Sequence, residues 1–412
     1  MSGTHTRIRI AAAAPSAARR RHCRGCGLLN LFVLATLVSV SPALCTPAHP
    51  QAVAKAAPET RRTETVAPGV ERIEIRRGDF WTGLGSDRWV INVLVLDPSR
   101  TRLTLGRAHD KIVGTETTSS IASRHGALAA TNGGYFRTDG PYRGEPAGIV
   151  LRAGRVLSEP SRRRPGLAVA NRGSRTRLAV VDVDLRTEVA ASWGARLRID
   201  GINRPRLANE LILFTPEFDR TTMTGPEGTE AIIERSRVVA ILAEKGDAEI
   251  PRAGWVLSAH GTAASWIRAN LRKGARLELR TDVRFSPCPA FPPEFIIGGG
   301  PRLVRGGKPA AAGDPGIYGA GFADARHPRT AAGVRADGRI LLVTVDGRQP
   351  ERSVGMTIAE LTALLIELGA VEAINMDGGG STTMAVRGRV VNSPSDLAGE
   401  RPVGDAILVM PR

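Results

Sequence analysis

Short runs of hydrophobic residues recur along this 412-residue chain between turn signals made of Gly, Pro, Asn and Asp. Most runs are rich in Val, Ile and Leu and too short for a helix, which is typical of β-strands. The pattern predicts strands at residues 89–97, 102–106, 127–131, 148–151, 178–184, 238–243, 254–258, 276–282, 339–346, 371–375 and 406–410. Strands therefore dominate the expected fold.

Three segments carry the helical period instead, at residues 117–125, 263–273 and 357–368. The clearest is the last, where Thr357 and Glu360 form a capping box ahead of a leucine-rich face. Together with the strands, these helices predict an α+β fold, a strand-rich mixed sheet with a few packed helices.

The N-terminal segment has the pattern of a secretory signal. Basic residues at positions 19–24 precede an apolar run at 28–40, and the segment Ser41–Thr46 then has the pattern of a cleavage site. The apolar run is short for a membrane span, although an uncleaved N-terminal anchor is an alternative. We therefore predict a signal peptide at residues 1–45, a secreted or periplasmic and cell-envelope location, and no membrane span in the mature chain.

The remaining chain divides by composition. Residues 46–66 contain Ala, Pro, Thr and charged residues without an apolar period, which predicts a flexible linker. One catalytic domain is expected over residues 67–412, with a possible inserted subdomain at 193–293 that ends in a Pro-rich stretch. Only Cys288 lies outside the leader, so no disulfide framework is expected, and an inert buried thiol is predicted there.

Charge and motif content narrow the function classes. The formal net charge is +17, but six arginines lie in the first 54 residues and the others are scattered, with only 4% aromatic residues. This distribution argues against nucleic-acid binding. The four histidines of the expected catalytic domain lack ligand spacing, and no serine-hydrolase elbow, P-loop or dinucleotide motif occurs. No metal or cofactor is predicted.

The strand at residues 371–375 leads into Asp377, which is followed by Gly378, Gly379 and Gly380. This places a carboxylate at the end of a strand. Because the three residues that follow it have no Cβ atoms, a ligand can approach it closely. A tight structural turn is the alternative interpretation of these glycines.

Two further glycine clusters follow strands, at residues 131–136 and 297–303, and Glu145 lies in a third glycine-containing segment at 144–148. Their flanking polar residues predict loops that converge on one ligand cavity. Separate turns or β-bulges are the alternative. Arg326, His327 and Arg329 lie in the basic segment 325–333, where guanidinium groups could bind a phosphate or form a solvated turn.

Several motifs together resemble the phosphodiester glycosidase family. They span the chain in order from about residue 67: TNGGYF, GEPAG, GGGPRLV, RHPRTAAGV, DGRILLVTVDGRQ, NMDGGGSTTM and ERPV. The resemblance implies hydrolysis at an anomeric carbon that bears a phosphate, within an α+β domain. It also implies a carbohydrate phosphodiester as substrate, while the sugar and aglycone stay open.

The chemistry of such a diester assigns roles to these residues. Because the departing phosphate monoester is a good leaving group, the main needs are a carboxylate, a cationic receptor and donors for sugar hydroxyls. We predict Asp377 as base or nucleophile, Glu145 as the paired carboxylate, and Arg329 with Arg302 as the phosphate receptor. The predicted substrate-binding groups also include Asn132, Gly133, Asn375, Gly378, Gly379, Ser381 and Thr382.

Two other functions fit the same pattern. One is a non-catalytic glycan-binding protein in exopolysaccharide or cell-envelope assembly, which the few aromatic residues near the motifs disfavour. The other is an α-glycosidase for uncharged linkages.

Overall fold

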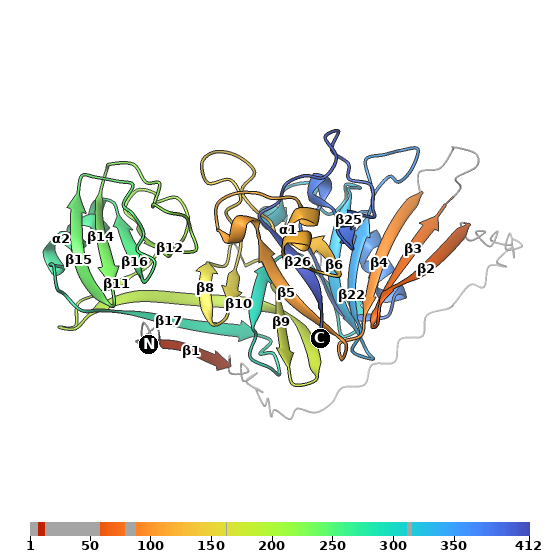
Figure 1. Cartoon of the computed structure of the whole chain (residues 1–412), viewed down its shortest axis with the longest axis horizontal. Coiled ribbons are helices and arrows are strands. Elements are labelled where there is room, and N and C mark those ends of the chain that lie inside the picture. The colour runs from red at the N-terminus through yellow and green to blue at the C-terminus, as the bar shows by residue number, and fades with distance from the viewer. Residues whose placement is uncertain (1–6, 13–57, 79–87, 162, 311–314) are drawn as a thin grey trace, which may run out of the picture. The chain divides into compact units, whose positions relative to one another are not determined.

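The computed structural model describes residues 7–12, 58–78, 88–161, 163–310 and 315–412. Residues 58–412 belong to one compact unit. Strands predominate and form four sheets, which confirms the strand-rich mixed architecture with a few helices (Figure 1). Most of the predicted signal peptide lies outside the described residues, and only β1 (Arg7–Ala12) is described from it, paired in parallel with β17.

The first sheet has eight strands, and one of them, β23, ends two residues before Asp377. Its central strands β4 and β22 are almost wholly buried because hydrophobic clusters cover both faces. Helix α4 (Ile358–Glu367) connects β22 to β23 and packs on β23 and β19, and its predicted capping box is present. In spatial order the strands are β2 (Glu59–Ala67), β3 (Val70–Arg77), β4 (Trp89–Leu96), β22 (Ile340–Val345), β21 (Arg329–Arg335), β23 (Ala370–Asn375), β19 (Arg302–Arg305) and β20 (Lys308–Pro309).

A second, five-stranded antiparallel sheet supplies two strands next to the site, one that ends at Asn132 and one that begins at Asp405. Helix α1 (Thr118–Arg124) covers it through a small apolar cluster that includes Ile121 and Leu408. Its order is β25 (Arg389–Val390), β24 (Met384–Val386), β6 (Ala129–Asn132), β26 (Asp405–Pro411) and β5 (Thr101–Arg107).

The third sheet contains the two longest strands, β10 and β17, which pair antiparallel and run toward the remaining sheet in Figure 1. Strand β11 (Arg196–Arg198) pairs with β10 off the main path. After β1 the order is β17 (Leu277–Ser286), β10 (Arg175–Ala191), β9 (Gly166–Arg172), β18 (Phe295–Gly298), β7 (Val150–Arg152) and β8 (Arg155–Ser158).

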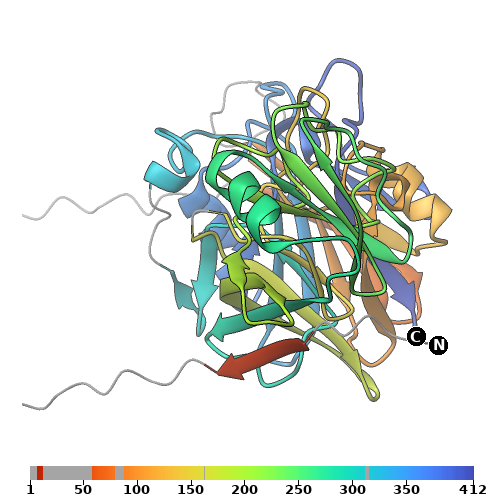
Figure 2. The same ribbon diagram turned by 90° about the vertical axis from the view of Figure 1, so that its left-hand side faces the viewer.

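The fourth sheet lies within the segment predicted as an inserted subdomain. It has its own hydrophobic cluster, shared with helix α2 (Gly261–Asn270), and Figure 2 turns this part toward the viewer. Its order is β12 (Gly201–Ile202), β13 (Leu211–Phe214), β16 (Gly254–Ala259), β14 (Thr229–Glu234) and β15 (Arg237–Ala243). The inserted subdomain at residues 193–293 stays a prediction.

Short helical turns complete the fold at α3 (Pro315–Tyr318), η1 (Ala108–Asp110) and η2 (Gly379–Ser381). Among the described residues, no helix is long and apolar enough to cross a membrane.

Two local expectations differ from the structure. Residues 59–66, expected in the linker, form most of β2, whose first seven residues are exposed. Such an edge strand is held by its backbone pairing with β3, so it needs no apolar period. Cys288 is exposed rather than buried because it lies in the Pro-rich stretch after β17.

Candidate active site

Strands β6, β18 and β23, from three different sheets, end in glycine-containing loops that meet at Asp377. The backbone N–H of Asp377 donates to Gly133 O at 3.1 Å, and the N–H of Gly300 donates to Asn375 O at 2.6 Å. Residues more than two hundred positions apart therefore share hydrogen bonds. The loops after β6, β18 and β23 therefore meet as predicted, and the ligand cavity expected between them stays a prediction.

Asn132 links the backbones of these loops. It is fully buried, and its Oδ1 accepts from Thr330 Oγ1 at 2.7 Å and from the N–H of Thr383 at 3.1 Å. Its Nδ2 donates to Asp377 O at 2.7 Å. All of these bonds are internal, so the geometry gives Asn132 a positioning role, and contact with substrate stays a prediction.

We expect Asn132→Ala to destabilise the protein by about 2–4 kcal/mol, because it leaves several buried polar groups without partners. Denaturant unfolding measures the loss. Asn270→Ala, at the partly exposed end of α2, is the matched control and should change stability by at most about 0.5 kcal/mol. Equal effects of the two variants would contradict the positioning role.

A second network fixes the end of β23. Asn375 Nδ2 donates to Tyr135 Oη at 2.8 Å, to Gly300 O at 3.0 Å and to Met376 O at 2.7 Å. Tyr135 Oη donates in turn to Gly300 O at 2.8 Å, and the Arg164 guanidinium lies 4.8 Å from the centre of the Tyr135 ring. Tyr135 and Arg164 thus support the strand end that carries Asp377.

The Asp377 side chain is partly exposed at this junction. Burial among the surrounding loops raises its pKa to about 6, and the negative charge of Asp405 acts in the same direction. The Ser381 hydroxyl, the Gly378 N–H and the charge of Arg401 oppose this rise. The Gly378 N–H donates to Asp377 Oδ1 at 3.0 Å. A carboxylate with a pKa near neutrality is suited to accept a proton at physiological pH.

Three buried side-chain oxygens near Asp377 lack a hydrogen-bond partner among the described residues. They are Asn375 Oδ1, Ser381 Oγ and Thr382 Oγ1. Ser381 Oγ influences the pKa of Asp377 without reaching normal hydrogen-bond geometry. Since buried polar groups are normally paired, these atoms favour a polar ligand at this position.

Two of the predicted glycines are required by close packing. A Cβ on Gly133 would lie 2.3 Å from Asp405 Oδ1, and one on Gly378 would lie 2.8 Å from Pro328 O. Substrate contact by either glycine stays a prediction. The structure adds Asp405 to the site, because it is buried, accepts from the N–H of Gly134 at 2.9 Å and raises the pKa of Asp377.

A cationic group covers the next glycine. Gly379 has φ +60°, and a Cβ there would lie 3.1 Å from Arg348 Nη2. Arg348 is exposed, lies 3.4 Å (Nη2) from His327 Nδ1, and forms no ion pair with a carboxylate of the described part of the chain. Burial and the charges of Arg329 and Arg348 lower the pKa of His327, which therefore is neutral at pH 7 and can act as a hydrogen-bond donor.

Arg329, the predicted phosphate receptor, is almost wholly buried. Its Nε donates to Met356 O at 2.8 Å, and its Nη2 donates to Phe322 O at 3.0 Å and Ala325 O at 2.8 Å. Burial lowers its pKa to about 10. Arg329 therefore holds neighbouring loops in place, and a direct contact with phosphate stays a prediction.

Arg302 and Glu145 make other contacts. Arg302 Nη1 lies 2.8 Å from Glu372 Oε2, and Glu145 Oε2 lies 2.9 Å from Arg137 Nε. Burial raises the pKa of Glu145. Neither side chain contacts the Asp377 carboxylate within the described ranges, so the roles of both in substrate binding and catalysis stay predictions.

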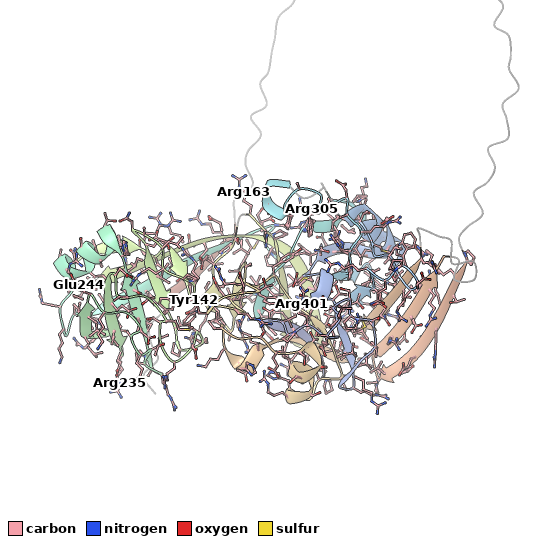
Figure 3. The ribbon with its side chains drawn as sticks, turned by 90° about the horizontal axis from the view of Figure 1, so that it is seen from above. Tyr142, Arg163, Arg235, Glu244, Arg305 and Arg401 are labelled. Atoms are coloured by element: carbon pink, nitrogen blue, oxygen red, sulfur yellow. The ribbon has the colours of Figure 1, made fainter. Side chains whose placement is uncertain are left out.

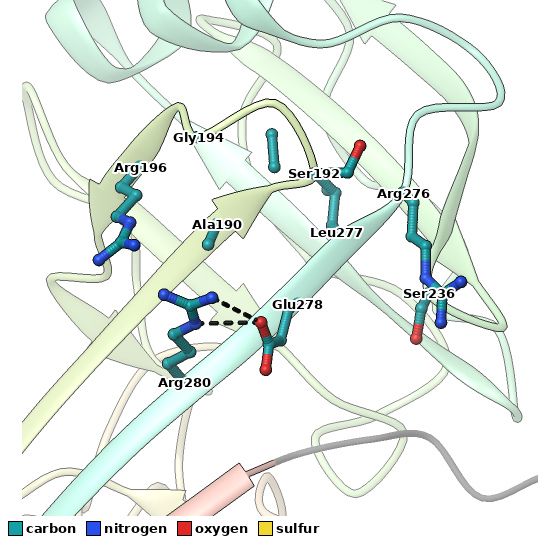
Figure 4. Close-up of a pocket in the computed structure, with 10 residues that line it drawn as sticks. Ala190, Ser192, Gly194, Arg196, Ser236, Arg276, Leu277, Glu278 and Arg280 are labelled. Carbon is teal, nitrogen blue, oxygen red and sulfur yellow. Dashed lines mark hydrogen bonds and ion pairs between the residues drawn. The ribbon is translucent and has the colours of Figure 1, made fainter.

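A cavity of about 530 Å³ lies elsewhere, where β10 and β17 approach the fourth sheet (Figure 4). Arg196, Arg276, Glu278 and Arg280 are among its lining residues, and Arg280 is hydrogen-bonded to Glu278 at 2.8 Å. None of the predicted site residues lines it. In the described part of the chain, no group of three or more His, Cys, Asp or Glu side chains is arranged to hold a metal ion.

Comparison with known proteins agrees with the motif resemblance. The family model for phosphodiester glycosidases matches residues 227–410, a segment that contains Asp377 but neither Asn132 nor Glu145. The match over these residues confirms the predicted resemblance to the phosphodiester glycosidase family.

Individual relatives match over shorter stretches. A prophage-derived protein of Bacillus subtilis is 42% identical over 84 residues, which is 20% of this chain and 13% of that protein. The bovine N-acetylglucosamine-1-phosphodiester alpha-N-acetylglucosaminidase is 37% identical over 75 residues, which is 18% of this chain and 14% of the enzyme. The matched stretches thus span about one-seventh of the relatives' own lengths.

Solved structures extend the similarity to nearly the whole fold. A protein of Burkholderia pseudomallei, described as exported, aligns with a TM-score of 0.75 and 26% identity over 89% of this chain and 98% of that one. A Synechocystis protein aligns with a TM-score of 0.71 and 22% identity over 86% and 64%, respectively, which shows a shared fold.

Proposed function

We propose that this protein is an exported glycoside hydrolase that cleaves a sugar 1-phosphodiester between the anomeric carbon and its oxygen. The observation that carries the proposal is Asp377, a carboxylate with a pKa of about 6 that lies beside buried oxygens without hydrogen-bond partners among the described residues. The nearby cation Arg348 contacts His327 and has no carboxylate partner in the described part of the chain. The family match and the activity in the bovine relative's name support the reaction class. The exported Burkholderia protein supports the location.

In this reaction the C1–O bond breaks and a phosphate monoester departs with the bonding electrons. Water supplies the new oxygen on C1 and loses a proton. Asp377 either accepts that proton or bonds to C1 first and is then released by water. Arg348 and His327 stabilise the charge on the departing phosphate, which needs little help from an acid because its second pKa is about 6.

The pH dependence of activity should reflect the ionisation of Asp377. We expect kcat/KM to fall about tenfold per pH unit below about 6, because protonation removes the reactive carboxylate. Since Arg401 lowers the pKa of Asp377, Arg401→Gln should move this acidic limb to higher pH. A limb that does not move, or activity that rises on acidification, would count against this role.

The direct test uses α-N-acetylglucosamine 1-(methyl phosphate) as substrate, with release of reducing sugar as the measurement. Turnover of this diester, and not of methyl α-N-acetylglucosaminide, supports the proposal. Turnover of the neutral glycoside at a similar rate would instead indicate an ordinary α-glycosidase.

A further inference from the structure

A second cavity, of about 400 Å³, has two lining residues, Asp396 and Arg401, that lie close to Gly380 in the turn after Asp377. It lies between the loop after β6 and the loop before β26, and Phe136, Arg143, Asp396 and Arg401 are among its lining residues. A Cβ on Gly380 would lie 2.2 Å from both Arg401 Nη2 and Asp396 Oδ1. Figure 3 shows Arg401 far from Arg235 and Glu244, which lie next to the strands β14 and β15 of the fourth sheet.

We infer that this cavity is the subsite for the neutral ring of the sugar, while the phosphate lies on the opposite side of the turn, at Arg348. The inference rests on the proposed function and assigns the two halves of its substrate. Arg348 approaches Gly379, whereas Arg401 approaches Gly380. The turn therefore separates a cationic side from the cavity side.

The charges that line the cavity favour a neutral ligand. The ionisable lining residues are Arg143, Arg401, Asp396 and Glu400, so their formal charges sum to 2 − 2 = 0. Arg401 Nε lies 2.6 Å from Asp396 Oδ2, and Nη2 lies 3.0 Å from Oδ1, which compensates that cation. Among these described lining residues, an anion would find no uncompensated cation apart from the exposed Arg143.

The shape and polarity fit a hydroxylated ring. The partly exposed ring of Phe136 gives an apolar surface, and the paired Asp396 and Arg401 present planar acceptors and donors to neighbouring hydroxyls. Glu400 fixes the position of the loop that lines the cavity, because its carboxylate accepts a hydrogen bond from the N–H of Ser119 at 2.8 Å. Sites of this volume, with an apolar surface and a few oriented polar groups, are typical for small ligands.

The test measures binding of neutral glycosides, which needs no turnover. The probes are the methyl α-glycosides of N-acetylglucosamine, glucose, mannose and galactose, followed by saturation-transfer NMR. We expect at least one to bind the wild-type protein, and Phe136→Ala to raise its Kd about tenfold or more, equal to about 1.4 kcal/mol. Thr138→Trp, which places a large ring at an exposed lining position, should also block binding.

Leu397→Ala is the control, because Leu397 is fully exposed in the same loop and does not line the cavity. The Kd of Leu397→Ala should stay within twofold of the wild type. Absence of binding by all four glycosides, or wild-type binding by both Phe136→Ala and Thr138→Trp, overturns the subsite. Hydrolysis together with glycoside binding that neither Phe136→Ala nor Thr138→Trp weakens overturns only this inference. Phe136-dependent binding without any hydrolysis overturns only the proposed function.

Discussion

Asp377→Asn is expected to reduce kcat on a sugar 1-phosphodiester by about 10³-fold or more, because an amide neither accepts a proton nor attacks C1. The substitution keeps the size of the side chain and an oxygen that can accept from the Gly378 N–H. KM should therefore change little. Initial rates of reducing-sugar release measure both constants.

The thermal stability of Asp377→Asn distinguishes a loss of catalysis from misfolding. Because the pKa of Asp377 is raised in the folded state, its ionised form disfavours folding above about pH 6, and this cost disappears as the pH falls below 6 toward the unfolded value of 3.8. Asp377→Asn should therefore have a higher Tm than the wild type at pH 8 and a smaller difference at pH 5. Retained turnover in this variant would exclude Asp377 as the catalytic carboxylate.

Arg348→Ala is expected to lower kcat/KM on the same diester by about 10²–10³-fold, because it removes the cation that faces the departing phosphate. Arg348 is exposed and has no carboxylate partner among the described residues, so its removal should leave Tm nearly unchanged. Arg348→Lys should restore part of the activity, since it retains the charge but not the planar donors.

The matched control is Arg305→Ala, another exposed arginine, which lies on β19 and is labelled in Figure 3. It should leave kcat/KM within about twofold of the wild type, as for most exposed positions outside a site. A loss of less than threefold in Arg348→Ala, or equal losses in both variants, would contradict the assignment of the phosphate receptor.

Local patterns predicted most of the elements. The Thr357 capping box and the leucine face located α4, and the β-branched runs located β4, β22 and β23. These elements are buried, so their hydrophobic pattern reflects the core directly. Strand β2 was not predicted, because its exposed residues carry no such pattern.

The candidate site was only partly predictable for a different reason. Asp377 was marked by its own neighbours, a strand before it and glycines after it. Asp405 and Arg348 act on the site through contacts outside their own motifs, with Gly134 at 271 positions and His327 at 21 positions from them, respectively. The DGRQ and ERPV motifs contain Arg348 and Arg401, but the sequence does not show which guanidinium is compensated by a carboxylate.

The central claim is cleavage at the anomeric carbon by the site built around Asp377. Hydrolysis of α-N-acetylglucosamine 1-(methyl phosphate) in ¹⁸O-labelled water, followed by mass spectrometry of both products, tests it most directly. The account predicts that the label appears on C1 of the sugar and that Asp377→Asn forms this product about 10³-fold more slowly or slower still. Label in the phosphate would show cleavage of the P–O bond and contradict the account.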